Sequence, residues 1–351
     1  MFLQIGDFPA NPSSNGHEAI IRSKTLEARI LTYGASLCEL RLADIPYSLV
    51  LGFPDAKDYH MRSGHFGAIA GPVANRIAGG TATLDGKMLS FEKNENNLNT
   101  LHGGAVGTGR LVWSIAEQSK ASVRLTLCLP DGYLGFPGPM RLSCHYHVTD
   151  TAELILSLTA EADQKSFCNL ASHPYFCLDD TDDFRHHSLQ IKASHYLPIT
   201  DEKIPTGSIY SVSNTAFDYR NNRSLGSLVS GEENPIDHCF CWSNEKSKAP
   251  NILRERATLT SNYSGISMTV MSDQPGLQFY TGHGIKDGLI GHDGKRYAPF
   301  SGLCLEAQAL PDAPNQPHFP SIEITPDKTY NQQTRLCFSC AYYSYKKGYK
   351  S

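Results

Sequence analysis

The fold is decided by the stretch Met140-Arg-Leu-Ser-Cys-His-Tyr-His-Val148 and by Leu154-Ile-Leu-Ser-Leu-Thr159, which follows it closely. Apolar side chains stand at nearly every second position of both stretches. Successive side chains of a β-strand point to opposite faces of its sheet, whereas a helix would repeat its apolar positions every 3 or 4 residues. The alternation therefore predicts two β-strands, each with one face in a hydrophobic core.

The same alternation recurs along the chain, for example at residues 28–33, 123–129 and 267–271. Typical turn dipeptides separate such segments: Asp85-Gly86, Asp131-Gly132, Ser264-Gly265 and Asp293-Gly294. With 29 Gly, 20 Pro and hardly any helical periodicity, helices should be few and short, and residues 55–60 are one candidate. We predict an all-β fold, a large antiparallel β-sandwich. No linker or repeat divides residues 1–351, so we expect a single domain.

Composition limits the possible partners of the chain. A formal net charge of -4 over 351 residues gives no basic surface for nucleic acid. No apolar run approaches the roughly 20 residues that span a bilayer, and the N-terminal residues lack the pattern of a secretory signal. We expect a cytoplasmic protein that is a monomer or a homodimer and binds neither nucleic acid nor membrane.

The 10 cysteines are scattered, mostly inside apolar runs such as those around Cys38, Cys128, Cys144, Cys168 and Cys304. In a chain of this length they are more typical of reduced core thiols than of a disulfide framework.

Metal motifs are weak in this sequence. The pair Cys337-x-x-Cys340 has no second pair, and His145-x-His147 has no further ligands at a suitable spacing. The acidic run at residues 179–183 lacks the glycine and the spaced ligands of a calcium loop, so we expect a solvated loop there. We predict no metal and no cofactor. A nucleophilic Gly-x-Ser-x-Gly elbow is also absent.

Glu306 is the first candidate for a catalytic base. It lies in the apolar run Gly302-Leu-Cys-Leu-Glu306, which ends at Pro311. A strand that buries Leu303 and Leu305 on one face points Cys304 and Glu306 to the other, near the end of the strand. A carboxylate is rarely placed among apolar residues unless it is paired or used, because burying an unpaired charge is costly.

Other segments place polar residues where a strand should simply pack. Asn75 and Arg76 stand in a run of small residues and can supply several fixed donors. From that segment alone, a structural pairing of Arg76 with a neighbouring loop is as plausible as a role in binding. His102 precedes Gly103 and Gly104, which either allow close approach of a ligand or make a turn.

Three further candidates follow in the second half of the chain. His173 is held in an extended conformation by the proline after it, but a lone histidine among apolar residues is more often a core histidine. Asp237 and His238 adjoin, and in a strand they would face opposite ways. Gln278 lies in the run Gln274-Pro-Gly-Leu-Gln-Phe-Tyr-Thr281, which offers an amide and an aromatic surface.

Taken together, these segments resemble the aldose 1-epimerase (galactose mutarotase) family in order and over nearly the whole chain. The matching stretches are Asn75-Arg-Ile77, Leu101-His-Gly-Gly104, Asp131-Gly-Tyr-Leu-Gly-Phe-Pro-Gly138, His173-Pro-Tyr-Phe176, Asp237-His238, Gln274-Pro-Gly-Leu-Gln-Phe-Tyr-Thr-Gly282, and Leu305-Glu306 through Phe319-Pro320. The resemblance implies the antiparallel β-sandwich of galactose mutarotases and an isomerase that interconverts the α and β anomers of free aldohexoses such as glucose and galactose.

The resemblance also implies roles for individual residues. Glu306 looks like the base that removes the proton from the anomeric hydroxyl, and His173 looks like the acid that protonates the ring oxygen. The residues that resemble sugar-binding groups of the family are Arg76, Asn75, His102, Asp237 and Gln278. No metal or cofactor is implied.

The chain departs from the family pattern at a few positions. Pro72 stands where many relatives have an arginine, Pro174 follows the histidine where serine is commoner, and Asp327-Lys328 replaces Gly-Glu. The first two leave the sugar preference open. Two alternatives also stay open: an epimerase of a modified or phosphorylated sugar, and a non-catalytic sugar-binding protein on the same fold.

Overall fold

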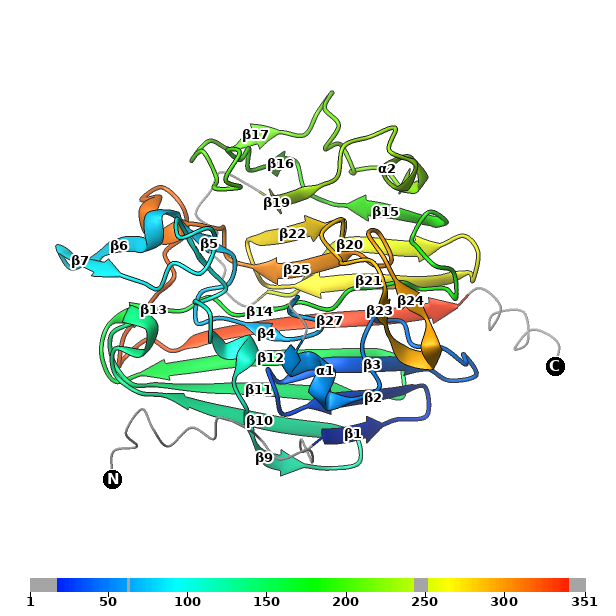
Figure 1. The fold of residues 1–351 in the computed structure, drawn as a ribbon, viewed down its shortest axis with the longest axis horizontal. Helices are drawn as coiled ribbons and strands as arrows, with labels where there is room; N and C mark the ends of the chain where they lie inside the picture. The colour runs from blue at the N-terminus through cyan, green and yellow to red at the C-terminus, as the bar shows by residue number, and fades with distance from the viewer. Residues whose placement is uncertain (1–17, 62–63, 243–251, 341–351) are drawn as a thin grey trace.

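The computed structural model describes residues 18–61, 64–242 and 252–340. Two packed layers of antiparallel sheet form the molecule (Figure 1). The larger layer is one nine-stranded sheet, whose strands in spatial order are β18 (Arg223–Ser224), β15 (His187–Ile191), β20 (Arg254–Ser261), β21 (Ile266–Ser272), β27 (Tyr330–Cys340), β12 (Glu153–Ala162), β11 (Met140–Val148), β10 (Ser122–Leu129) and β9 (Ser114–Gln118).

Two smaller sheets lie on the inner face of the nine-stranded sheet. The three-stranded one contains β1 (Glu18–Arg22), β2 (Leu26–Leu31) and β3 (Ser36–Leu42). The five-stranded one contains, in spatial order, β17 (Tyr210–Ser211), β16 (His195–Tyr196), β19 (Asp237–Cys241), β22 (Gly276–Tyr280) and β25 (Cys304–Gln308). An internal cavity lined by residues of β3, β11, β12, β25 and β27 marks where the layers face each other.

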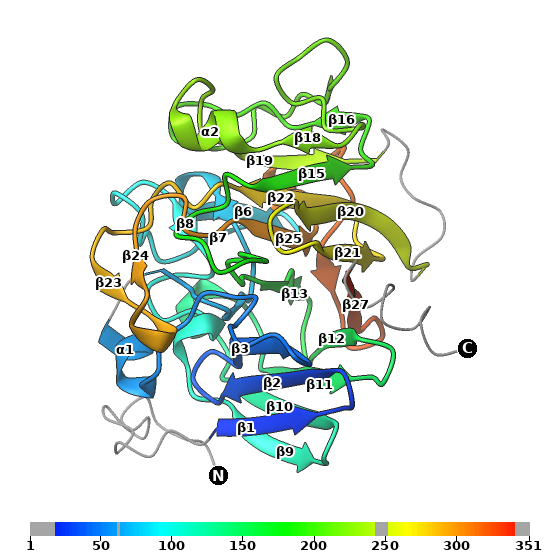
Figure 2. The same cartoon turned by 90° about the vertical axis from the view of Figure 1, so that its right-hand side faces the viewer.

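The remaining ladders are short two-stranded pairs. They are β4 (Ile69–Ala70) with β14 (Ala171–Ser172), β5 (Arg76–Ile77) with β8 (Thr100–Leu101), β6 (Thr81–Leu84) with β7 (Lys87–Ser90), β13 (Ser166–Phe167) with β26 (Glu323–Ile324), and β23 (Leu289–Ile290) with β24 (Arg296–Tyr297). The described residues form two short α-helices, α1 (Ala56–Met61) and α2 (Gly226–Ser230). Figure 2 shows α2 and β16 at one end of the molecule and β1 and β9 at the other.

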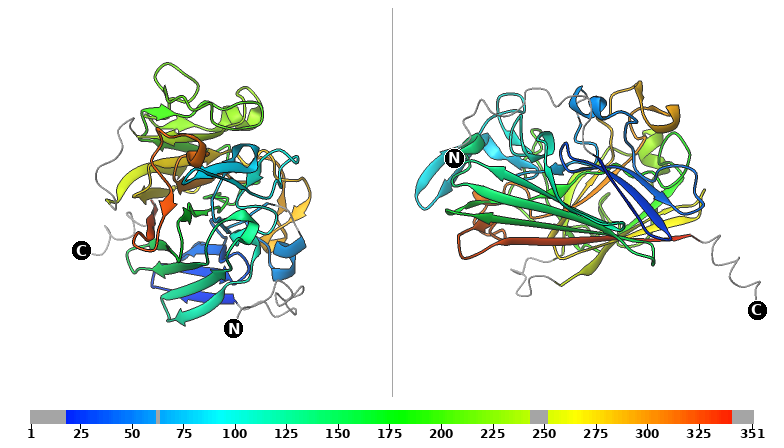
Figure 3. Two further views of the ribbon diagram at one scale, coloured as in Figure 1. Left: turned by 90° about the vertical axis from the view of Figure 1, so that its left-hand side faces the viewer. Right: turned by 90° about the horizontal axis from the view of Figure 1, so that it is seen from below.

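The deciding stretch folds as its alternation predicts. In β11, every second side chain from Met140 to Val148 is buried, and in β12 every second one from Leu154 to Ala162. The buried rows of these strands meet β1–β3, which cross over the large sheet in the right-hand view of Figure 3. Tyr146 of β11 spans the interface, because its hydroxyl donates to the carbonyl oxygen of Ala35 at 2.9 Å. The core therefore lies between the two layers.

One predicted turn and the predicted short helix are confirmed. Asp85 and Gly86 form the two-residue turn of the β6–β7 hairpin, and both have positive φ, of 48° and 76°. Such a turn matches the twist of the flanking strands. The short helix expected at residues 55–60 is α1. No helix in the described ranges is long and apolar enough to cross a membrane.

Two local expectations are wrong. All ten cysteines are free, but Cys128 lies on the exposed face of β10 rather than in the core, because it falls on the outward phase of the strand. Asp179 is buried rather than solvated. Its carboxylate accepts hydrogen bonds from the hydroxyls of Ser261 and Thr181, which replace water as partners. The neighbouring Asp180 and Asp182 are exposed, as expected.

The predicted core gives a test of stability. Leu158 on β12 is fully buried, so Leu158→Ala should lower the free energy of unfolding by about 2–5 kcal/mol. The matched change Leu98→Ala removes the same atoms from a side chain that is 53% exposed and should cost far less. Urea unfolding of both variants measures the difference. Equal losses would contradict the assignment of the core to this face of β12.

Candidate active site

The strand β25 positions Glu306. Its side chains alternate as the sequence predicts: Leu305 lines the cavity between the layers, whereas Cys304 and Glu306 point to the opposite face. The strand ends at Gln308, two residues after Glu306. Glu306 is only 2% exposed, so its side chain is shielded from nearly all solvent.

The register of the neighbouring strands brings a row of polar side chains to the same face. Gln278 of β22 lies directly opposite Glu306 of β25. Two residues further along β22, Tyr280 lies opposite Asp237 of β19 on one side and opposite Cys304 of β25 on the other. Residues paired across antiparallel strands share a face, so these five side chains lie together although they come from three separate segments of the chain.

The segment that carries His173 runs antiparallel beside β25. Phe176 and Leu303 exchange backbone hydrogen bonds of 2.7 and 3.0 Å. At the other end, the side-chain oxygen of Asn169 accepts a hydrogen bond from the backbone N–H of Ala309 at 2.9 Å. These contacts hold His173 between them, facing β25.

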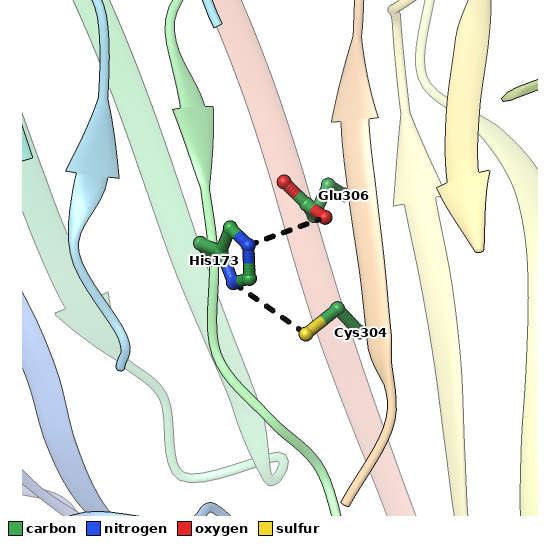
Figure 4. A group of neighbouring side chains, drawn as sticks. All are labelled: His173, Cys304 and Glu306. Carbon is green, nitrogen blue, oxygen red and sulfur yellow. Dashed lines mark hydrogen bonds and ion pairs between the residues drawn. The ribbon is translucent and has the colours of Figure 1, made fainter. Parts of the chain in front are cut away.

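Figure 4 shows the resulting contact between His173, Cys304 and Glu306. The Nε2 atom of His173 lies 3.7 Å from Oε1 of Glu306, and its Nδ1 atom lies 3.5 Å from Sγ of Cys304 in a hydrogen bond. The imidazole therefore uses one nitrogen toward the carboxyl group and the other toward the thiol. The structure thus brings the two predicted catalytic residues together from distant parts of the sequence.

Burial shifts both titrating groups toward their neutral forms. The pKa of Glu306 is raised well above its usual value by burial and by the nearby Asp237 carboxylate, and Arg76 opposes this shift. Burial lowers the pKa of His173 to about 4. Both shifts disfavour charge in a site of low polarity. The favoured arrangement is a protonated carboxyl group beside a neutral imidazole, so the pair holds one transferable proton.

Asp237 is the charged carboxylate of the site. Burial alone would raise its pKa, but the charges of Arg76 and Lys203 and a hydrogen bond from Gln278 lower it below the usual value. Gln278 Nε2 donates to Oδ1 of Asp237 at 2.8 Å, and Lys203 Nζ donates to Oδ2 at 3.1 Å. The neighbouring His238 faces the other way, against the ring of Phe217, as the strand alternation predicts.

Asn75, Arg76 and His102 come from two other segments, and the ring of His102 lies 5.5 Å from that of His173. The backbone N–H of His102 donates to the carbonyl oxygen of Asn75 at 3.0 Å, and Nδ1 of His102 accepts from the N–H of Asn75 at 3.2 Å. Because Nδ1 is an acceptor and burial lowers the pKa of His102 well below its usual value, Nε2 carries the hydrogen and is a donor. The loop lies close because Gly103 has no side chain: a Cβ there would come within 2.1 Å of the Gly71 oxygen.

Arg76 combines the two interpretations that the sequence left open. Its Nε and Nη2 atoms bind both carboxylate oxygens of Glu95, at 2.8 and 2.9 Å, which is the structural pairing with a neighbouring loop. Its charge still reaches Asp237 and Glu306, since it lowers the pKa of both. The side-chain oxygen of Asn75 is occupied locally, because it accepts from the backbone N–H of Arg76.

Comparison with known proteins places this chain in a family. The profile of the aldose 1-epimerase family matches residues 19–337. The chain belongs to the aldose 1-epimerase family. The family membership expected from the sequence motifs is thereby confirmed.

Several relatives cover nearly all of the chain. The galactose mutarotase of Bos taurus is 38% identical over 92% of this chain and 93% of its own length. The aldose 1-epimerase of Escherichia coli (strain K12) is 31% identical over 88% and 91% of the two chains. Among solved structures, an aldose epimerase homologue from C. elegans has a TM-score of 0.85 and 29% identity, with 93% and 99% of the chains covered. The predicted galactose mutarotase-like sandwich is confirmed.

Sequence reasoning missed several side chains of this aldose 1-epimerase family member. The ring of His65 lies 4.6 Å from that of His102 and 6.0 Å from that of His173, and burial lowers its pKa to about 3. The ring of Tyr175 lies 5.1 Å from that of His173. Lys203 was also missed. His65 and Lys203 lie in no motif of the sequence. Tyr175 lies in the matching stretch His173-Pro-Tyr-Phe176, but no role was predicted for it.

Two buried acceptor atoms stand out within the described part of the chain. Oε2 of Glu306 and Oε1 of Gln278 have no hydrogen-bond partner there, although both are shielded from solvent. A buried polar atom without a partner is costly, and such atoms in a native structure call for an explanation. A ligand with hydroxyl groups can supply the missing donors.

The raised pKa of Glu306 gives a stability prediction. An unfolded glutamate ionises near about pH 4.3, whereas the folded site retains its proton to higher pH. The unfolded state therefore binds fewer protons in between, and stability falls as the pH rises through that window. Glu306→Gln removes this loss, so its stability relative to wild type should grow between about pH 4 and about pH 8.

Urea unfolding at the two pH values measures this growth. Glu117→Gln, at an exposed position of β9, is the matched control and should show no comparable change. A stability gain for Glu306→Gln that shrinks as the pH rises would show that the folded site prefers an ionised Glu306.

Proposed function

We propose that this chain is a mutarotase that interconverts the α and β anomers of free aldohexoses such as glucose and galactose. Its membership of the aldose 1-epimerase family makes it an isomerase, of the racemase and epimerase class, that acts on carbohydrates. The observation that carries the proposal is the buried contact between Glu306 and His173, with one carboxylate oxygen left without a partner among the described residues. We assign Glu306 as the base and His173 as the acid.

The reaction needs two coupled proton transfers. Glu306 takes the proton from the anomeric hydroxyl O1, the C1–O5 bond breaks, and C1=O1 forms. O5 receives the electron pair and takes the proton from Nε2 of His173. After rotation about the C1–C2 bond, O5 attacks the other face of C1, His173 recovers its proton, and Glu306 returns its own to O1. Atoms and charges balance over the cycle, with no other reactant.

The electrostatics of the site favour the middle of this cycle. After ring opening, Glu306 is protonated and His173 is neutral, which is the distribution that burial favours in the protein. The site therefore stabilises the open-chain intermediate relative to the charged pair. Each positioned proton transfer contributes typically about 10²–10⁴-fold to a rate.

Hydroxyl groups of a sugar would find matching partners around the pair. The Oε1 atom of Gln278 accepts, Nε2 of His102 donates, and Asp237 and Arg76 supply opposite charges. We propose these four residues, together with Asn75, as the groups that bind the substrate. The proposed chemistry calls for no metal or cofactor.

Free sugars fit better than phosphorylated ones. Arg76 is bound by both oxygens of Glu95, and Lys203 is paired with Asp237. A phosphate normally requires converging cations that are free to bind it. A non-catalytic sugar-binding protein is also disfavoured, since such a protein has no need to keep a costly buried carboxyl group beside a histidine. A cytoplasmic location is part of the proposal and is supported by the ten free cysteines.

The assignment of acid and base predicts the effect of neutral replacements. Glu306→Gln and His173→Asn should each reduce the acceleration of α-glucose or α-galactose mutarotation by about 10²-fold or more, because each removes one proton transfer. Polarimetry measures the rates. The controls Glu255→Gln and His147→Asn change the same residue types on β20 and β11 of the nine-stranded sheet and should leave the rates unaltered. Wild-type rates in both site variants would refute the assignment.

Asp237 should set the pH range of the reaction. Its negative charge raises the pKa of both Glu306 and His173. Asp237→Asn removes that charge, so both values should fall and the profile of kcat/KM should shift toward lower pH. The control Asp218→Asn, on a peripheral loop paired with Arg220, should not move the profile. A shift toward higher pH would contradict the proposed coupling.

A further inference from the structure

The contact in Figure 4 joins three chemically different donors. One nitrogen of His173, the sulfur of Cys304 and an oxygen of Glu306 all lie within 4.8 Å of one another, and all three residues are buried. The mechanism uses the imidazole and the carboxyl group but gives the thiol no part. Nitrogen, thiolate sulfur and carboxylate oxygen are the ligands that zinc and related soft divalent cations take in proteins.

We propose that His173, Cys304 and Glu306 together bind one thiophilic divalent cation, such as Zn²⁺ or Cd²⁺, and that the bound cation blocks the site. The cation is an inhibitor of the proposed reaction and not a part of it. The binding half of the inference rests on the donor geometry alone, whereas the inhibition half rests on the proposed function.

The spacing of the donor atoms supports binding. Ligand bonds to zinc of about 2.0–2.3 Å in a tetrahedral arrangement place neighbouring donor atoms roughly 3.3–3.8 Å apart. Sγ of Cys304 and Oε1 of Glu306 approach different ring nitrogens, at 3.5 Å from Nδ1 and 3.7 Å from Nε2, and a set of one nitrogen, one sulfur and one oxygen lies within 4.8 Å. A single cation takes one of the two nitrogens, so the donor on the other side of the ring must move inward. Three protein ligands leave a fourth position for water.

One donor atom of this triad has its hydrogen-bonding capacity unused. Oε2 of Glu306 is buried and has no hydrogen-bond partner among the described residues. The side-chain contacts of the His173 ring nitrogens are with Cys304 and Glu306, the other two members of the triad. The triad therefore contains a buried acceptor with an unmet need for a positive or hydrogen-bearing partner.

A second cluster in the molecule has the same three kinds of donor atom and serves as an internal contrast. Cys177, Asp179 and His187 also bring a sulfur, an oxygen and a nitrogen within 4.8 Å. However, Nε2 of His187 accepts the backbone N–H of Leu178 at 2.8 Å, so its Nδ1 must carry the hydrogen and cannot bind a metal. The carboxylate of Asp179 is already bound by Ser261 and Thr181. Proximity alone therefore does not make this second cluster a site.

Binding must release protons. Burial raises the pKa of the Cys304 thiol well above its usual value, so the S–H bond is intact in the free protein, and coordination replaces that hydrogen by the cation. One proton leaves from the thiol and a second leaves from Glu306 where the carboxyl group is protonated. Apparent affinity should therefore rise with pH. A bound cation occupies the carboxylate and the imidazole at once, so sugar and cation should compete.

Cd²⁺ titration of the full chain tests the site. We expect one equivalent to bind, with an ultraviolet thiolate-to-cadmium absorption band and proton release in calorimetry performed in two buffers. Cys304→Ala should lose the band and lower the affinity by at least about tenfold, because the soft ligand is gone. Cys304→Ser provides a second variant that keeps a small polar side chain, and it should lose the band as well.

Matched controls separate the possible outcomes. Cys177→Ala, in the contrasting cluster, and Cys128→Ser, at the exposed thiol, should both keep the band and the affinity. A band that survives in Cys304→Ala, or one that disappears in Cys177→Ala or Cys128→Ser, overturns the inference. If the unmodified protein accelerates mutarotation but binds no cadmium, the proposed metal site is refuted and the proposed function is not. Cadmium binding through Cys304 in a protein that does not accelerate mutarotation refutes the proposed function and leaves the metal site standing.

Discussion

The structure of the site depends on keeping one carboxyl group away from water. Glu306 lies on a strand whose residues are all buried, and it meets an imidazole instead of a cation. In such surroundings the charged form of either group is costly, so proton positions are governed by small differences in environment. A ring-opening step that moves one proton onto a carboxylate and another off an imidazole suits that environment, because both groups are neutral while the sugar is open.

The surrounding charges set how far each group is shifted. Asp237 remains a carboxylate because Lys203, Arg76 and Gln278 stabilise its charge. Its negative charge then raises the pKa of Glu306, while Arg76 acts in the opposite sense. Arg76 is itself bound to both carboxylate oxygens of Glu95, so its direct ion pair is with that residue. The two carboxyl groups thus keep different protonation states although they share one face of one sheet.

Much of the fold could be predicted from local patterns. The alternation in residues 140–148 and 154–159 gave both the strands and their buried faces, and the dipeptide Asp85-Gly86 marked a hairpin turn. The orientations of Glu306 and Asp237 also followed from strand alternation. Cys128 and Asp179 were wrongly placed because burial depends on the phase of a strand and on partners such as Ser261, which are distant in the sequence.

By itself, the sequence determined which strands form, which side chains share a face of each strand, and which family the motifs resemble, because these depend on the order of neighbouring residues. Only the tertiary structure decided that His173 meets both Cys304 and Glu306, that Arg76 is held by Glu95, and that His65 and Lys203 approach the site. Those contacts are set by sheet register and by the path of the segment 169–176 along β25. The sheet register and the path of segment 169–176 are fixed by pairing between distant segments. They cannot be predicted from the spacing of residues along the chain.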